Sequence, residues 1–522
     1  MTPSRSDAST AGSRAAIVAR LRSAVAPRLG IDPRALAAFR IALGLILLGD
    51  LLFLRVPGLH AFYTDAGTFP RSALAELYPT FEALSLHALS GSAWAQGLLF
   101  LIAGVFAGLL LVGYRTTLAT LASALLLASM QARNPYVLNG GDTILLSLLV
   151  LGLFLPLGAR WSIDARRRGR CADRDTAADT PATVDDRVLS VATATILVHF
   201  VTIYAVNGVL KTRSETWMNG TAVAQIFHLE QFIVGLGPYL AEQTPLLVAA
   251  NWSWSALLTA APLLLVCRDR LRFALAGAFV GAQLGLAATM RLGAFPFVMV
   301  AALLLFFPPR VWDRLEAALE RTGLERRLES ATDRTVATDG GRRLPSLPSI
   351  TIPPTVRRVT RVAGNVVLIC FLVGLIAWQA AGLGVAEMPE EVVEDDVEDV
   401  SWAFFAPEPI SGTWWYAWEA DLESGETIDT LRDESGAIDR PPDAADRYPS
   451  TLWMRYGLDL RSADESEYEP LADYLCDRVA AEHETGPDTD LESVTVYTVE
   501  QPVGPSGPVG DLEVDRRIEY GC

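Results

Sequence analysis

The stretch "LVHFVTIYAVNGVLK", residues 197–211, closes an apolar run with the only lysine among the 43 basic residues of the chain. The run starts at residue 188 and is long enough to cross a hydrocarbon core of about 30 Å as a helix. The chain as a whole is 51 % hydrophobic with a mean hydropathy of +0.29. Together these features predict an α-helical polytopic membrane protein. Eight further apolar segments, at about 35–54, 93–113, 117–133, 143–158, 245–267, 271–290, 292–308 and 363–383, bring the expected number of transmembrane helices to about nine.

The arginines between these segments predict an orientation. Loops rich in arginine stay on the cytoplasmic side of a membrane. "DARRRGR" (164–170), "CRDRLR" (267–272) and the segment 309–362 all fall on one side when the N-terminus is cytoplasmic. We therefore expect a multi-pass protein of the cell membrane with an extracytoplasmic C-terminal domain. The two apolar segments around Arg291 could instead form a re-entrant hairpin.

Charge is distributed very unevenly along the chain. Residues 384–522 hold 36 Asp and Glu against 8 Arg, a formal charge of −28, whereas the whole chain carries −17. Such an acidic domain argues against a nucleic-acid partner, and basic loops beside a membrane suit anionic lipids. An acidic surface almost without lysine is the composition expected of a halophilic microbe. The expected domains are a cytoplasmic N-terminal segment (1–34), a transmembrane domain (35–310), a cytoplasmic linker (311–362), a last transmembrane helix (363–383) and an acidic extracytoplasmic domain (384–522).

The acidic domain carries its own structural signals. "GTWWYAWEADLESGETIDTLR" (412–432) alternates apolar and polar residues around a Ser-Gly turn, which predicts a β-hairpin. Residues 463–484 have helical spacing and residues 491–501 resemble a strand, so we expect a compact β-rich domain with one helix. Its two cysteines, Cys476 and Cys522, are predicted to form a disulfide. The five cysteines of the chain show no metal-ligand spacing, so no metal is expected.

Lys211 has two interpretations. A lysine at the end of a membrane helix can simply extend its ammonium group to the lipid headgroups, but arginine does this equally well. Only lysine can become a neutral amine when it is desolvated, and a neutral amine can act as a base or a nucleophile. Because this chain uses arginine everywhere else, the sequence favours a specific chemical role for Lys211.

Polar residues inside or beside the spans are candidate partners of Lys211, because such groups are costly there unless they face a protein interior. Tyr204 and Asn207 share a helical stripe with Lys211. His199 lies nearly three turns deeper, where a hydrogen-bonded core histidine is the favoured interpretation, and His228 is evenly balanced between surface and site. The loop "ARNPYVLNGGDTILL" (132–146) contributes Arg133, Asn134, Asn139 and Asp142, either as a capped turn or as part of the site. By contrast, Gly277, Gly281 and Gly285 predict close helix packing, with a ligand cleft as the less favoured alternative.

The segment "GVLKTRSETWMNGTAV" (208–223) resembles the lysine-containing segment of the vitamin K-dependent gamma-glutamyl carboxylases and their prokaryotic relatives, the horizontally transferred transmembrane (HTTM) family. In that family a Gly-x-x-Lys is followed by Trp and then Gly, at positions that match Gly208, Lys211, Trp217 and Gly220. The gap between Lys and Trp is one residue longer here. Other parts of the chain also resemble this family and occur in the same order as in it: Arg40 and Asp50, "FYTDAGTFPR" (62–71), "LVGYRTTLA" (111–119), "RNPYVLNGGD" (133–142), "FLPLGARWSID" (154–164) and "FFAPEP" (404–409).

This resemblance implies a function. In the carboxylases the matching lysine, as a neutral amine, deprotonates a reduced quinone, and the reaction ends in carboxylation of a glutamate side chain. Lys211 would be the catalytic base here, with a menaquinol-like reduced quinone as cofactor. The quinone or substrate would be bound by Tyr204, Asn207, Trp217, Arg133, Asn134, Asn139, Asp142, His199 and His228.

One departure from the carboxylases stands out, because they carry a histidine in the loop where this chain has "LNGGD" (138–142). The expected function is therefore a carboxylase-like reaction or another oxidation that depends on a membrane quinone, acting on an extracytoplasmic protein or a small molecule. The alternative is a membrane protein that is not an enzyme, a transporter or an assembly factor, in which Lys211 is structural.

Overall fold

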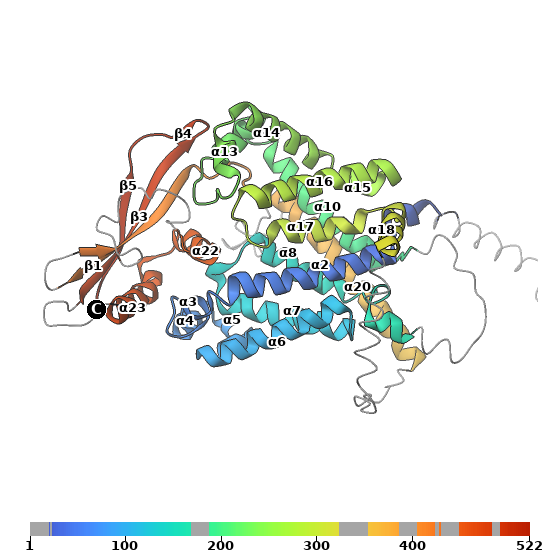
Figure 1. The fold of residues 1–522 in the computed structure, drawn as a ribbon, viewed down its shortest axis with the longest axis horizontal. Helices are drawn as coiled ribbons and strands as arrows, with labels where there is room; N and C mark the ends of the chain where they lie inside the picture. The colour runs from blue at the N-terminus through green and yellow to red at the C-terminus, as the bar shows by residue number, and fades with distance from the viewer. Residues whose placement is uncertain are drawn as a thin grey trace, which may run out of the picture.

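The computed structural model describes residues 20, 23–168, 187–322, 353–385, 404–422, 427–429, 448–482 and 491–522. Most of the predicted linker 311–362 and the start of the predicted acidic domain, 386–403, lie outside these residues. Figure 1 shows a body of long helices running roughly side by side, with a small β-sheet at one end. Helix α22 (Thr451–Leu460) lies between the sheet and the helical body.

Five helices in the described part of the chain are long and apolar enough to cross a membrane. The first combines α2 (Pro33–Asp50) with the π-helical turn η1 (Leu51–Arg55). The others are α6 (Ala93–Val112), α10 (Val191–Lys211), α16 (Asp269–Thr289) and α20 (Pro354–Gly382). These helices agree with a multi-pass membrane protein.

The expected count of nine spans is not confirmed. The four remaining predicted segments form helices that are shorter, interrupted or less apolar. Helix α8, for example, has 13 residues and rises only about 20 Å, less than the hydrocarbon thickness. The segment after Arg291 bends by 103° between Phe306 and Pro309, as a broken span or a re-entrant segment would. These four segments are α7 (Thr116–Arg133), α8 (Gly140–Gly152), α14 (Thr244–Thr259) with α15 (Leu263–Val266), and α17 (Phe295–Leu303) with η4 (Leu304–Phe306), which leads into α18 (Pro309–Thr322).

The glycine stripe of α16 does not pack closely within this chain. A Cβ atom built on Gly277, Gly281 or Gly285 meets no other atom within 4 Å. The expectation of close packing is therefore wrong for contacts within the chain, and Gly285 instead lines a cavity between α16 and its neighbours. The close approach lies elsewhere, at Gly44 of α2, where a Cβ atom would come within 2.8 Å of the backbone of Leu111 in α6.

Short helices fill the connections between the long ones. They cover one end of the helical body, the end that faces the β-sheet in Figure 1. Between α2 and α6 these are α3 (Leu59–Tyr63), α4 (Arg71–Leu77), α5 (Pro79–Leu84) and η2 (Leu86–Leu89); η3 (Pro135–Val137) precedes α8, and α11 (Glu215–Met218), α12 (Ala222–Ile226) and α13 (Gly237–Ala241) precede α14.

The C-terminal part forms an antiparallel sheet of five strands with two helices. Strand β1 (Gly412–Leu422) pairs antiparallel with β2 (Thr427–Asp429), which confirms the predicted strand pairing, while the Ser-Gly turn at 424–425 lies outside the described residues. Strand β3 (Leu491–Gly504) pairs with β1, with β4 (Gly507–Pro508) and with β5 (Glu513–Gly521). Helix α23 (Glu465–Glu482) matches the predicted helix, but α22 was not predicted. It packs closely on the sheet, since a Cβ atom at Gly457 would lie 2.7 Å from the ring of Tyr416.

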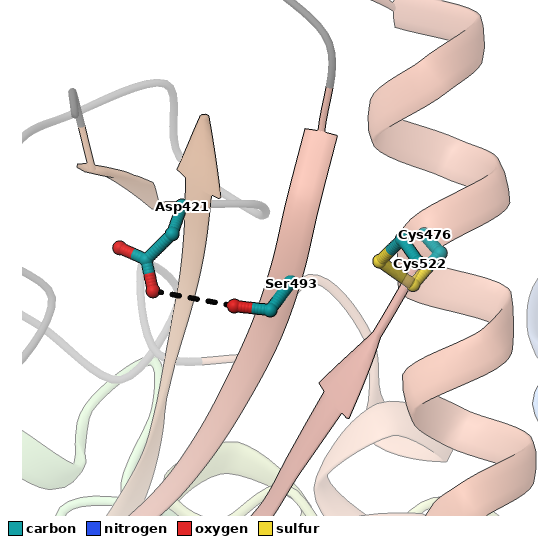
Figure 2. Close-up of a disulfide and its surroundings, with 4 residues drawn as sticks. All are labelled: Asp421, Cys476, Ser493 and Cys522. Atoms are coloured by element: carbon teal, nitrogen blue, oxygen red, sulfur yellow. Dashed lines mark hydrogen bonds between the residues drawn. A yellow bond between two sulfur atoms is a disulfide. The ribbon is translucent and has the colours of Figure 1, made fainter. Parts of the chain in front are cut away.

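A disulfide ties the end of the chain to this domain. Figure 2 shows Cys476 on α23 bonded to Cys522, which directly follows β5, with their Cα atoms 5.7 Å apart. The predicted pairing is confirmed. In the same view Ser493 of β3 donates a hydrogen bond of 3.5 Å to Asp421 of β1.

The sheet domain docks on the helical body through hydrogen bonds that side chains donate. The Arg455 guanidinium on α22 donates two hydrogen bonds, of 2.8 and 2.5 Å, to the carbonyl oxygen of Leu138. Arg291, after α16, donates to the carbonyl oxygen of Tyr448, and Tyr136 donates a short hydrogen bond to Glu467. These contacts place α22 directly over the loop that precedes α8.

Candidate functional site

Lys211 lies at the C-terminal end of α10 and is almost completely buried, with 3 % of its surface exposed. Its Nζ atom donates hydrogen bonds of 2.6 Å to the carbonyl oxygen of Phe404 and 3.0 Å to that of Phe405. Nζ also lies 4.0 Å from the centroid of the Trp217 ring, a cation–π distance. Within the described residues, no carboxylate forms an ion pair with Lys211. Lys211 therefore points into the protein and away from lipid.

Residues 404–405, whose carbonyl oxygens accept the hydrogen bonds of Lys211, are kept in position by neighbouring side chains. The amide of Phe404 donates 3.0 Å to Asn207 Oδ1, and Trp217 Nε1 donates 2.9 Å to the carbonyl oxygen of Phe405. Four residues later, the Glu408 carboxylate accepts hydrogen bonds from the Thr216 hydroxyl and from the Glu215 amide. These bonds lower the pKa of Glu408, the bond from Thr216 most strongly. The motif "FFAPEP" thus lies across the end of α10.

Two adjacent glycines make room for this segment. A Cβ atom on Gly140 would lie 2.3 Å from the ring of Phe404, and one on Gly141 would lie 2.7 Å from the backbone of Phe295. The Phe295 and Phe404 rings pack with their centroids 4.5 Å apart. Gly140 is therefore needed for close packing against the segment that contacts Lys211, and Gly141 for close packing against α17.

A cavity of about 810 Å³ opens beside Lys211. Its wall is formed by α10, α14, α16 and α17, and residues 404–410 and α22 close the end next to the sheet domain. The lining is mostly apolar, so the cavity is less polar than the sequence suggested. The charged groups that line it are Lys211, Arg291, Glu408 and Arg455, and the uncharged polar groups include Asn139, Tyr204, Asn207 and Gln283.

Gln283 is a candidate site residue that the sequence analysis missed. It lies in α16, its side chain is 1 % exposed, and its Nε2 donates 3.0 Å to the Tyr204 hydroxyl. Its Oε1 is buried and has no hydrogen-bond partner among the described residues. A buried acceptor on a cavity wall is available to a hydroxyl of a ligand. The signal was present in the sequence, because an amide within an apolar span is costly unless it has a partner.

Four of the predicted partner residues meet at this cavity: Tyr204, Asn207, Trp217 and Asn139 all line it together with Lys211. Tyr204 stacks on Phe279 with ring centroids 4.3 Å apart, so its ring is fixed in the wall. Asn139 caps α8, since its Oδ1 accepts from the amides of Gly141 and Asp142.

Asp142 lies outside the cavity lining and belongs to a second buried cluster. Its Oδ1 accepts a hydrogen bond of 2.7 Å from Arg55, and its Oδ2 accepts from the amide of Asn139. Arg55 also donates 3.0 Å to Asp50 and 2.8 Å to the Tyr63 hydroxyl. Asp142 therefore completes an ion cluster and a helix cap.

The other predicted residues also lie outside the lining. Arg133 donates to the carbonyl oxygens of Phe69 and Thr64, and Asn134 donates to that of Phe62, so both stabilise the connection after η1. His199 is buried, with Nε2 3.1 Å from the Ser147 hydroxyl, in the manner of a core histidine. His228 is half-buried after α12, and burial lowers its pKa. No group of three or more metal-ligating side chains occurs in the described part of the chain.

Comparison with known proteins gives one match. A family model described as the HTTM domain matches residues 29–312, more than half of the chain. No curated protein and no solved structure matches. The matched residues include the cavity walls on α10, α14, α16 and α17, whereas residues 404–410 and α22 lie beyond them.

Proposed function

The chain belongs to the HTTM domain family, and on that premise we propose that it is a membrane enzyme in which Lys211 acts as a base on a reduced membrane quinone in this cavity. The reaction is carboxylase-like and takes place at the extracytoplasmic end of the helical body. One observation carries the proposal: the only lysine of the chain is buried, forms no ion pair within the described residues and lines a large apolar cavity.

The hydrogen bonds of Lys211 suit a neutral amine. A neutral amine has two N–H donors and one lone pair, and the carbonyl oxygens of Phe404 and Phe405 accept the two donors. Burial without an opposite charge disfavours a permanent ammonium ion. The lone pair of Nζ is then free to accept a proton from a hydroxyl in the cavity. The ammonium that forms has a third N–H, and the face of the Trp217 ring, 4.0 Å away, stabilises its charge.

The cavity fits an amphipathic ligand of the quinone class. Apolar walls on four helices suit a ring and an isoprenoid tail, and polar groups are few. Besides Lys211, the unpartnered Oε1 of Gln283 offers an acceptor for a ligand hydroxyl, with Tyr204 holding the amide in place. A bound reduced quinone would supply the acidic hydroxyl and, with oxygen and carbon dioxide, the chemistry of oxidation and carboxylation.

The proposal is tested by ligand retention and by turnover. We expect protein purified from its native membrane to retain a quinone that solvent extraction and mass spectrometry detect. Gln283→Leu should weaken that retention, whereas Gln379→Leu, an amide in α20 outside the cavity lining, should not. Incorporation of labelled carbon dioxide into a glutamate-containing peptide should require added reduced quinone. Absence of both binding and turnover would reject the proposal.

A second function is favoured by the same hydrogen bonds. Lys211 joins α10 to residues 404–405, which precede the C-terminal sheet domain, here called the outer domain. Lys211 could therefore fasten this domain in a transporter or assembly factor that performs no chemistry. In that case Lys211→Arg, which keeps the donors, should preserve function, while Lys211→Ala should loosen the outer domain and increase its cleavage in limited proteolysis. If Lys211→Arg abolishes function without changing proteolysis, the enzymatic proposal is favoured.

A further inference from the structure

A second, small cavity lies in the helical body, separate from the cavity at Lys211. It measures about 30 Å³ and lies between α2, η2, α6 and α7. Its lining is apolar except for Asp50, His87 and Ser123. These three side chains are buried, with 7 %, 1 % and 4 % of their surfaces exposed. A polar cavity needs roughly 10–15 Å³ to hold a water-sized ligand, so this one is large enough.

Each of the three polar side chains presents an unsatisfied atom. Asp50 Oδ1, His87 Nε2 and Ser123 Oγ are buried and have no hydrogen-bond partner among the described residues. On His87 the other ring nitrogen, Nδ1, lies 2.7 Å from the Ser129 hydroxyl, and if Nδ1 carries the proton, Nε2 is an acceptor. Carboxylate, imidazole and hydroxyl then each have a lone pair without a partner among the residues that line the cavity.

The charges beside the cavity do not balance. Asp50 and Asp142 share a single guanidinium, that of Arg55, which leaves a formal charge of −1 in a buried cluster. Both oxygens of Asp142 are hydrogen-bonded, whereas only Oδ2 of Asp50 is. The excess negative charge therefore lies next to the cavity, at Asp50 Oδ1, where burial makes an uncompensated charge costly.

The other charged and titratable groups nearby have partners of their own. Tyr63 accepts a hydrogen bond from Arg55. Arg133 is bound to the carbonyl oxygens of Phe69 and Thr64 and lies 3.7 Å from Asp65. Asp65 in turn pairs with the partly exposed Arg71. None of these groups lines the small cavity.

We propose that the small cavity is a site for one monovalent positive charge, held by Asp50, His87 and Ser123. Two sources share this chemistry, a proton bound to the Asp50 carboxylate and a monovalent metal cation such as Na⁺. In both cases the positive charge lies beside the three unpartnered atoms and balances the second carboxylate of the Arg55 cluster. The site does not depend on the function proposed for Lys211.

The experiment uses the purified full-length chain and distinguishes the two sources. The first readout is the infrared band of a protonated carboxylic acid, recorded in choline chloride and in NaCl of equal ionic strength. The second is the unfolding temperature as NaCl replaces choline chloride. A proton predicts an acid band that Asp50→Asn removes. A metal cation predicts no such band in NaCl, and a saturable rise of the unfolding temperature that Asp50→Asn abolishes.

Two further variants keep the test decisive. Ser123→Ala removes one ligand with little change in volume, so it should shift the acid band or weaken the response to Na⁺ even if Asp50→Asn does not fold. Asp164→Asn removes a carboxylate that caps α7 outside the cavity, and it should leave both readouts unchanged. A wild-type protein with neither an acid band nor a saturable response to Na⁺ would overturn the proposal.

Discussion

Two buried cations in the helical body, Arg55 and Lys211, have opposite surroundings. Arg55 forms ion pairs with two carboxylates, at 3.0 Å and 2.7 Å, and a hydrogen bond to a tyrosine. Lys211 has two carbonyl oxygens and an aromatic face but no ion pair within the described residues, and it borders a cavity of about 810 Å³. A cation held by counter-charges is fixed in its charged form. A cation without them is free to change its protonation state, which is what a base requires.

The largest effect should follow from Lys211→Arg. We expect the variant to fold and insert normally but to lose activity by about 10²–10⁴-fold, because a guanidinium stays protonated and cannot act as a base. The measurement is quinone-dependent turnover in purified protein, with the amount of folded protein checked separately.

The matched control for this change is Arg213→Lys. Arg213 lies two residues further along and is exposed, donating to the carbonyl oxygen of Leu383. Its replacement should leave turnover close to that of the wild type. A fully active Lys211→Arg protein would end the enzymatic interpretation and would make the two buried cations equivalent.

The next largest effect should follow from Arg55→Met. Removing this guanidinium leaves Asp50 and Asp142 buried together, and we expect unfolding to become easier by about 3–5 kcal/mol. Lys211→Met leaves only the carbonyl oxygen of Phe404 without its donor, since Phe405 keeps the bond from Trp217. We therefore expect the free energy of unfolding to fall by about 1–3 kcal/mol. Both values come from denaturant unfolding in detergent. Equal losses of unfolding free energy in the two variants would show that the surroundings of Arg55 and Lys211 do not differ as described.

A smaller effect is the pH dependence of stability that arises from His87, which lines the same small cavity as Asp50 of the Arg55 cluster. Burial lowers the pKa of His87 from 6.5 to about 4, and the charge of Arg133 adds to this shift. The folded state therefore favours neutral His87, so its contribution is complete above about pH 6.5 and is lost as the pH falls towards 4. By linkage this loss is on the order of 2–3 kcal/mol.

The check is the unfolding free energy of wild type and His87→Gln between pH 4 and pH 7. The variant should lose less stability on acidification, because glutamine does not titrate. Identical pH profiles for the two proteins would contradict the prediction.

The smallest effects are expected at two glycines, one in crowded surroundings and one with open space beside it. Gly140→Ala should destabilise the protein by about 1–2 kcal/mol, because the new Cβ atom would collide with the Phe404 ring. Gly277→Ala should stabilise it by about 0.5–1 kcal/mol, because nothing lies within 4 Å and alanine favours a helix. Thermal unfolding of both variants tests the signs. A stabilising Gly140→Ala would show that Phe404 is not held against α8.

The sequence predicted well those features that depend on local pattern. The apolar run before Lys211 became the buried helix α10, and the alternation in 412–432 became the pairing of β1 with β2. Helix α22 was missed because ten residues interrupted by Gly457 give a weak periodic signal, and the sheet stabilises them. The count of nine spans is not confirmed, since a 13-residue helix such as α8 is apolar but shorter than the hydrocarbon thickness.

The candidate site likewise combines features that the sequence predicted with features that only the tertiary structure decided. The sequence alone singled out Lys211, because a lone lysine in an arginine-rich chain can be seen in the composition, and it placed Tyr204 and Asn207 beside it by helical spacing. Only the tertiary structure decided that Asp142 pairs with Arg55, that Gln283 reaches the cavity, and that Phe404 and Phe405 bind Lys211 from 193 and 194 residues away. Spacing within one helix fixes which side chains share a face. The partner that covers that face depends on how distant segments pack, and a single sequence carries no local signal for it.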